Sequence, residues 1–289
     1  MANPVFDRLD KQITKGDYAG FDRGAGTSGA SAGGAVQDTV NSRQLQDMYN
    51  QPSARPVQMR RVTLDDVVMK TLGLFSLLLV VAAASWITVD NYVTTNNGDI
   101  GLAMGVMLGA MLAGLAVGLV IAFKKTINVP LIVLYSALEG VVVGTISVVF
   151  EKYYPGLVAT AVIATLCTFA GMFLGWRFGI IKVTDKSRRI FGLAIIGYLL
   201  FGLVNLVVVL VSGSGSGFGI GGTGPLGIAI SVLGVGLASY SLAIDFDSVD
   251  RAVKAELPEK YSWLLAHGLI VTLVWLYLEI LRLLARLRQ

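Results

Sequence analysis

Residues 127–150 read INVPLIVLYSALEGVVVGTISVVF, an apolar stretch with one acidic residue, Glu139, near its middle. Residues 263–284 read WLLAHGLIVTLVWLYLEILRLL and place Glu279 in similar surroundings. At about 1.5 Å per residue, either stretch is long enough as a helix to cross a bilayer core of about 30 Å. A carboxylate is costly to bury in hydrocarbon unless it is protonated, paired or hydrated. The two stretches therefore predict membrane-spanning helices that carry an acidic functional site.

Five further stretches are apolar, uncharged and of similar length. They are residues 71–89, 101–123, 156–176, 190–212 and 224–244. The composition agrees with them, because 54% of the residues are hydrophobic and only 15% are charged, whereas soluble domains have roughly 25% charged residues. The sequence predicts an all-α, polytopic membrane protein with a bundle of seven transmembrane helices over residues 61–289. Residues 1–60 are polar and rich in Gly and Ser, which predicts a disordered tail.

Basic residues gather in alternate connections between these stretches. The second connection carries Lys124 and Lys125, and the fourth, RFGIIKVTDKSRR, carries five basic residues. The first, DNYVTTNNGD, and the fifth, GSGSGFGIGGT, carry none. Because cytoplasmic loops carry an excess of Lys and Arg, the pattern predicts a multi-pass protein with a cytoplasmic N-terminus.

The C-terminus does not fit this alternation. Seven spans would place Arg282, Arg286 and Arg288 on the opposite side. Either the last segment does not cross completely, or these arginines extend to the outer headgroups. We favour seven spans.

Two local patterns predict how particular helices begin and pack. Residues 57–70 are of mixed polarity and predict a short surface helix, with Thr63 and Asp66 as a capping pair at its start. In the second span, Gly105 and Gly109 are four residues apart, as are Gly114 and Gly118. Small residues on one helix face allow close approach in a membrane, so we expect the second helix to be tightly packed.

The residue counts argue against several classes of function. The chain has one cysteine, Cys167, and one histidine, His267, which excludes a Cys/His zinc site and disfavours a Cys–His or Ser–His–Asp centre. The net charge of +4 is modest and indicates attraction to anionic lipid rather than to nucleic acid. We expect no enzymatic activity, no tightly bound cofactor and no nucleic-acid partner.

Three segments resemble a known family. Residues 239–250, SYSLAIDFDSVD, resemble the Y-D-x-x-x-I signature that closes the sixth helix of the transmembrane Bax inhibitor motif family. Residues 273–284, LVWLYLEILRLL, are similar to its L-Y-L-D-F-I-N-L-F segment in the last helix, and residues 135–147, YSALEGVVVGTIS, resemble its third-helix T-G-x-x-L-G segment. The resemblance covers roughly residues 65–287 in the right order. It implies a seven-helix bundle with the last helix near the centre, located in the plasma membrane.

The resemblance also implies a gate. In that family, acidic residues of helices six and seven form a hydrogen-bonded carboxyl pair, which corresponds here to Asp245 and to Glu279 in place of Asp. Two carboxyl groups in a low-dielectric site share one proton, and their oxygens suit Ca²⁺ as transient ligands. Glu139, where the family has an uncharged residue, is a third candidate for ion binding. Ile244 replaces the family's Tyr.

Four further residues are candidate modulators of this gate. Lys124 and Lys125 stand where bacterial members of the family have an arginine latch. Asp247 lies close to Asp245 in sequence, and Arg282 lies one helical turn after Glu279.

These residues predict a pH-sensitive calcium leak, a cation-permeable channel whose partners are the lipid bilayer, calcium ions and protons. The alternatives are a proton-coupled transporter, or a non-conducting protein that regulates a partner such as a membrane protease. An intramembrane aspartyl protease is disfavoured because its G-x-G-D context is missing.

The carboxyl groups of Asp245 and Glu279 can form a pair only under one geometric condition. If the last helix ran on from Pro258, Glu279 would lie about 31 Å along it and Asp245 only about 13 Å from the same membrane face. The two carboxyls meet only if residues 258–266 lie along the membrane surface and the span begins near His267.

Overall fold

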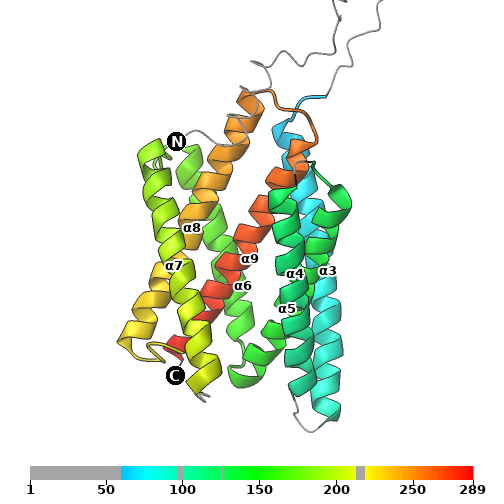
Figure 1. Cartoon of the computed structure of the whole chain (residues 1–289), viewed down its shortest axis with the longest axis vertical. Coiled ribbons are helices and arrows are strands. Elements are labelled where there is room, and N and C mark those ends of the chain that lie inside the picture. The colour runs from blue at the N-terminus through cyan, green and yellow to red at the C-terminus, as the bar shows by residue number, and fades with distance from the viewer. Residues whose placement is uncertain (1–59, 97–99, 125, 213–218, 289) are drawn as a thin grey trace, which may run out of the picture. The chain divides into compact units, whose positions relative to one another are not determined.

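The computed structural model describes residues 60–96, 100–124, 126–212 and 219–288, without the side chains of residues 209–212. In this part of the chain, seven helices are long and apolar enough to cross a membrane. They are α3 (Leu64–Thr95), α4 (Gly101–Phe123), α5 (Val129–Tyr153), α6 (Leu157–Arg177), α7 (Asp185–Ser212), α8 (Pro225–Lys254) and α9 (Tyr261–Leu287) (Figure 1). The all-α, seven-span architecture is confirmed. The predicted disordered tail lies outside the described residues, apart from Arg60.

The last helix is the centre of the bundle, as the resemblance implied. α9 packs against α3, α5, α6 and α8, and in Figure 1 it runs obliquely between them. Leu276 and Leu281 of α9 are fully buried in one core cluster with α6 and α8, whereas Ile270 is fully buried in a second cluster with α3 and α5. The buried residues of α9 include both apolar and polar side chains on several sides of the helix.

The last segment is one uninterrupted helix. α9 begins at Tyr261 and ends at Leu287, and its 27 residues are enough to cross the bilayer. The length and composition of the last segment therefore favour the interpretation with seven spans.

The first span begins earlier than predicted. Residues 64–70 are the first turns of α3 and not a separate surface helix, because Val67 is buried in the same cluster as Leu281 of α9. The capping pair is confirmed. The Asp66 amide donates to Thr63 Oγ1 at 3.2 Å, and the Thr63 amide donates to Asp66 Oδ2 at 3.2 Å.

Thr63→Ala removes this cap. We expect a loss of about 1 kcal/mol, the usual contribution of an N-cap hydroxyl, which lowers the thermal unfolding midpoint by about 2–4 °C in a protein of this size. The midpoint in detergent is the measurement. Thr95→Ala, at the exposed far end of the same helix, is the control and is expected to change the midpoint by less.

The start of α3 is attached to the connection between α8 and α9. The Val62 amide donates to the Leu257 carbonyl at 2.8 Å, and Arg61 forms an ion pair with Glu256 at 2.5 Å. Lys70 bonds to Glu259 at 3.1 Å. These contacts fix the end of the molecule at which α9 begins.

Two glycines of α5 allow α3 to approach closely. A Cβ atom added at Gly140 would lie 2.7 Å from the Leu78 carbonyl oxygen and 2.9 Å from Val81 Cβ. One added at Gly144 would lie 2.9 Å from Ser85 Cβ. Real Cβ atoms essentially never lie so close to atoms of another helix. The close contact of α3 with α5 therefore requires glycine at these two positions.

The prediction that the second span is tightly packed through its glycines is wrong. A Cβ atom added at Gly105 or Gly109 would meet nothing within 4 Å, and one at Gly114 would make only an ordinary contact at 3.9 Å. Only at Gly118 is the space tight, 3.1 Å from the Tyr135 ring. α4 packs mainly on α5, and its buried residues are Ala103, Ala110 and Gly114, so most of its surface faces lipid.

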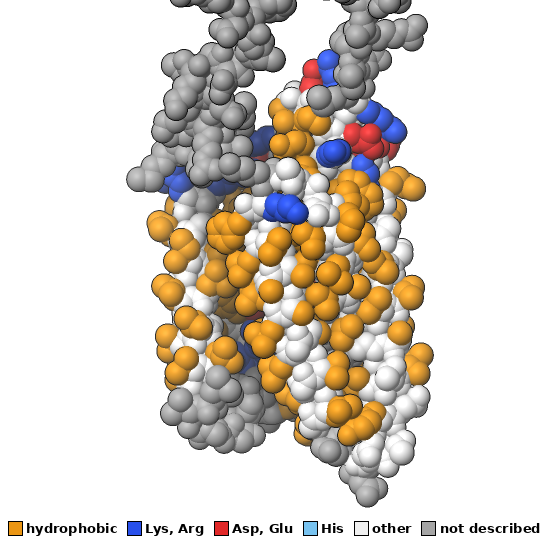
Figure 2. Space-filling model, turned by 45° about the vertical axis from the view of Figure 1, so that its right-hand side comes forward, with side chains coloured by type: hydrophobic (Ala, Val, Ile, Leu, Met, Phe, Trp, Pro, Cys, Tyr) orange, Lys and Arg blue, Asp and Glu red, His pale blue; other side chains and the backbone are white. Residues whose placement is uncertain are grey.

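α7 is attached to the bundle differently from the other helices. None of its described residues is fully buried. It packs mainly on α8, and Tyr198 also contacts Glu279 and Trp275 of α9. Apolar side chains cover the helices in Figure 2, and charged side chains gather toward one end. Lipid solvates apolar side chains as well as a neighbouring helix does, so apolar contacts contribute little to the docking of α7. The polar contacts of α7 therefore determine its position.

Candidate functional site: a polar seam between α7, α8 and α9

Polar side chains of three helices face one another along the α8–α9 contact. We call this set the polar seam. It comprises Arg188 and Tyr198 of α7, Ser231, Asp245 and Asp247 of α8, and Thr272, Glu279, Arg282 and Arg286 of α9. Because α8 and α9 follow each other in sequence and run antiparallel, the start of α8 lies beside the end of α9.

Glu279 is the most enclosed carboxyl of the polar seam, with 3% of its surface exposed. The Tyr198 hydroxyl donates to its Oε1 at 2.8 Å, and Trp275 Nε1 donates to the same oxygen at 3.2 Å. Arg282 Nη1 bonds to both oxygens, at 3.1 and 3.2 Å. A Cβ atom on Gly234 of α8 would lie 2.6 Å from Oε2, so the space for this carboxylate exists because α8 has a glycine there.

Asp245 has no comparable set of partners. Its carboxyl faces the Thr272 hydroxyl of α9 and the Arg188 cation of α7. Its Oδ2 is buried and has no hydrogen-bond partner among the described residues. Leaving a buried acceptor unsatisfied costs about 1–3 kcal/mol, and more for a charged group. This carboxyl therefore favours binding a proton or a cation.

The carboxyl pair implied by the resemblance is not formed. Asp245 lies beside Thr272, which precedes Glu279 by seven residues of α9, or about 10 Å of helix. Glu279 lies beside Gly234, eleven residues before Asp245 in α8, or about 16 Å. Pairing would require the last span to begin near His267, but α9 is a continuous helix from Tyr261. In this structure the two carboxyls are therefore too far apart to be ligands of one calcium ion.

Asp247 belongs to an ion-pair network at one end of the polar seam. Arg188 Nη2 of α7 bonds to its Oδ2 at 2.5 Å, and Arg251 Nε bonds to the same oxygen at 2.7 Å. The carboxylate is neutralised by two cations, so Asp247 attaches α7 to α8 and is a less suitable cation site than Asp245.

Arg286 occupies the other end of the polar seam. It is 4% exposed, and its Nη1 donates to the Gly227 carbonyl and, at 2.7 Å, to Ser231 Oγ of α8. A guanidinium with buried partners fixes geometry more than a mobile side chain does. Arg286 therefore fixes the end of α9 against the start of α8. Arg282, by contrast, has 45% of its side chain exposed.

Glu139 lies apart from the polar seam. The Tyr135 hydroxyl donates to its Oε1 at 2.6 Å within α5, and the Tyr135 ring stands edge-on to His267 of α9, with ring centroids 4.6 Å apart. His267 Nδ1 is buried without a hydrogen-bond partner in the described part of the chain. Glu139 is thus a separate, half-buried carboxyl and not a third member of the polar seam.

The predicted lysine latch is not supported by contacts. Lys124 is exposed at the C-terminal cap of α4, a helix that packs mainly on α5. Lys125 lies outside the described residues. Within residues 60–96, 100–124, 126–212 and 219–288, no cluster of three or more His, Cys, Asp or Glu side chains is placed to hold a metal ion.

Sequence reasoning missed five members of the polar seam: Arg188, Tyr198, Ser231, Thr272 and Arg286. A signal for α7 was present, because Arg188, Tyr198 and Asn205 are three of its polar residues and fall on one side of the helix. Asn205 indeed accepts a bond from the Ile220 amide at 2.6 Å. No comparable signal marked Thr272, whose importance depends on what α8 places beside it.

The comparisons with known proteins agree with the architecture. The sequence model of the family described as Bax inhibitor 1 like matches residues 3–289, which is nearly the whole chain. The search among curated proteins gives no match.

Proposed function

Because the chain belongs to the Bax inhibitor 1 like family, we propose that this multi-pass membrane protein is a pH-sensitive, cation-permeable leak that passes Ca²⁺. The observation that carries the proposal is the buried Oδ2 of Asp245, which has no hydrogen-bond partner among the described residues. It lies between membrane-spanning helices, where an ionisable side chain is expensive and usually functional. The structure thus supports a gate built on one carboxyl rather than on a pair.

The proposed mechanism follows from the charge state of Asp245. When its carboxyl is protonated, it is neutral, donates to a neighbouring oxygen and is compatible with a dry, closed contact between α8 and α9. When it ionises, the buried charge faces Thr272 of α9 and Arg188 of α7, and Arg188 is already bonded to Asp247. The unbalanced charge is stabilised by water and cations entering the polar seam, so conductance rises with pH. Calcium suits such a site because it prefers oxygen ligands.

Glu279 has a different role in this proposal. Its charge is balanced by Arg282, and Tyr198 connects it to α7. Since α7 has few apolar contacts with the bundle, the Tyr198–Glu279 bond holds α7 against the polar seam. Glu279 therefore positions the wall of the pathway, whereas Asp245 titrates within it.

We further propose that the protein resides in the plasma membrane with its N-terminus in the cytoplasm. At the end of the helices where α3 and α9 begin lie Arg60, Arg61 and Lys70, together with the basic residues of the α6–α7 connection. This excess of positive charge favours the cytoplasmic side.

Asp245→Asn tests the gate. The amide cannot ionise, so we expect calcium flux through purified protein in proteoliposomes to be low and independent of pH, whereas flux through the unmodified protein increases as pH rises. Dye-reported calcium entry measured across a pH series is the readout. Asp250→Asn is the matched control, because Asp250 lies on the same helix but pairs with Lys254 at 2.6 Å, outside the polar seam. It should retain the pH dependence.

Two outcomes contradict the proposal. Asn at position 245 with an unchanged pH profile would remove Asp245 from the gate. Unmodified protein that passes no calcium at any pH, while folded, would instead favour the non-conducting regulator of a partner protein.

A further inference from the structure

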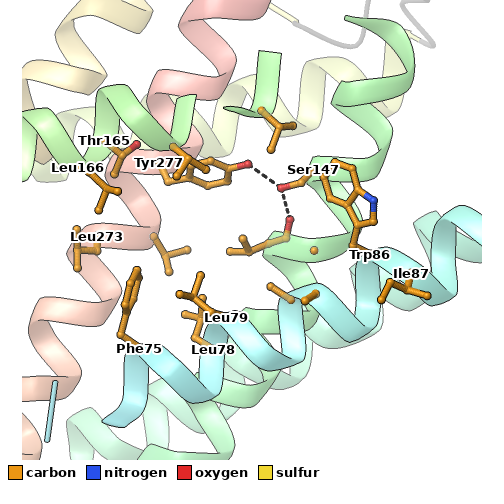
Figure 3. Close-up of a pocket in the computed structure, with 17 residues that line it drawn as sticks. Phe75, Leu78, Leu79, Trp86, Ile87, Ser147, Thr165, Leu166, Leu273 and Tyr277 are labelled. Atoms are coloured by element: carbon orange, nitrogen blue, oxygen red, sulfur yellow. Dashed lines mark hydrogen bonds between the residues drawn. The ribbon is translucent and has the colours of Figure 1, made fainter. Parts of the chain in front are cut away.

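A slender apolar cavity lies on the other side of α9 from the polar seam. Its volume is about 400 Å³, and its walls come from α3, α5, α6 and α9 (Figure 3). Along α3 it extends from Phe75 to Ile87, which is about 18 Å of helix. The hydrocarbon part of one leaflet is about 15 Å thick, half of a bilayer core. The cavity therefore has the length of one leaflet.

The mouth and the floor of this cavity belong to different helices. Leu79 of α3 and Val162 of α6 are exposed and form its rim, whereas Val274 and Tyr277 of α9 are each 7% exposed and form its floor. α3 and α6 both pack on α9, so the space between them opens sideways to the bilayer. An occupant enters from lipid and not from water.

The hydroxyl groups of the lining are satisfied within the protein. Ser147 Oγ donates to the Val143 carbonyl at 2.5 Å and shares a hydrogen bond with the Tyr277 hydroxyl at 2.6 Å, as Figure 3 shows. The Thr165 hydroxyl donates to the Ala161 carbonyl at 2.7 Å. Because no charged side chain lines the cavity, its surface offers contact to hydrocarbon and demands no hydrogen bond from an occupant.

One end of the cavity is marked by interfacial residues. Trp86 lines it there, and tryptophan is enriched at membrane interfaces. One helical turn further along α3, Asp90 forms an ion pair with Lys152 of α5 at 3.6 Å. Charged groups of both signs at this end match a zwitterionic headgroup. The opposite end, at Phe75 and Leu273, is apolar.

We propose that this cavity is a binding site for one acyl chain of a bilayer phospholipid, with the headgroup beside Asp90 and Lys152 and the chain extending toward Phe75. The occupant bridges α3 and α6, which the protein itself leaves apart. An empty cavity of this size would cost contact energy along its whole lining, and the acyl chain restores those contacts.

Photo-crosslinking in vesicles tests the site. The full-length protein is reconstituted in phosphatidylcholine that carries a photoreactive diazirine in one acyl chain, and labelled residues are identified by mass spectrometry. We expect labelling of the floor residues Val274 and Tyr277, which bulk lipid does not reach. Ala83→Phe, at the rim, should reduce floor labelling several-fold. Ala84→Phe adds the same ring to the neighbouring exposed position, which does not line the cavity, and should leave it unchanged.

A second pair of variants makes the test independent of α3. Val162→Phe is at the rim on α6, and Ile163→Phe is its exposed neighbour outside the lining. Equal floor labelling in rim and neighbour variants that melt like the unmodified protein would overturn the proposal, as would a floor that is never labelled. Floor labelling by a diazirine fatty acid but not by the phospholipid would overturn the assignment of the occupant.

Discussion

Gly140→Ala and Gly144→Ala are expected to destabilise the protein, each by about 1–3 kcal/mol, the usual cost of adding a methylene to a packed core. A loss of stability would be informative, because at an ordinary helix position Ala is more stabilising than Gly by about 1 kcal/mol. Here the new Cβ atom would lie 2.7 Å from the Leu78 carbonyl oxygen in one variant, and would press on the Ala82 backbone in the other. A backbone atom cannot move aside by changing rotamer, so α3 has to separate from α5.

The matched controls are Gly105→Ala and Gly109→Ala. Both glycines lie within α4, and a Cβ atom there meets nothing within 4 Å. We expect these variants to be neutral or slightly stabilised in thermal unfolding, while the α5 variants melt earlier and the double variant earlier still. If all four substitutions had the same effect, the close approach of α3 and α5 would be wrong.

Glu279→Ala is expected to have the second large effect on stability. The substitution leaves Tyr198, Trp275 and Arg282 without their common acceptor. Each orphaned buried donor costs about 1–3 kcal/mol, and the loss for Arg282 is smaller because its side chain is 45% exposed. We expect a total of about 3 kcal/mol or more, with α7 the first helix to detach.

Two further variants separate the parts of this effect. Glu279→Gln keeps an acceptor for Tyr198 and Trp275 and should cost less than half as much. The double variant Glu279→Leu with Arg282→Leu removes both charges, and replacing an ion pair by apolar groups is often nearly neutral, so it should be more stable than Glu279→Leu alone. Thermal unfolding measures stability, and proteolysis of the α7 ends measures detachment. Equal stability of the single and double Leu variants would show that the ion pair is not the cause.

Much of the architecture could be predicted from the sequence, because a bilayer imposes a simple rule. Every backbone polar group in hydrocarbon has to be bonded within its own helix, so uncharged stretches such as residues 101–123 are sufficient to predict spans. The capping pair at Thr63 could be read for a similar reason, since its partners are three residues apart. Which glycines mark a close helix contact could not be predicted from the sequence. Gly105 and Gly140 both lie in apolar stretches, and they differ only in whether another helix lies beside them.

In the candidate site, too, some features could be predicted from the sequence and others could not. The sequence by itself determined the number of spans, the buried position of Glu279 and the presence of an acidic residue near the end of α8, since these depend on transfer of local groups from water to lipid. Only the tertiary structure decided which groups meet. Asp245 lies beside Thr272 and Glu279 beside Gly234 because an uninterrupted α9 fixes the register of two antiparallel helices. Register depends on contacts summed over the whole length of both helices, and no short motif contains that sum.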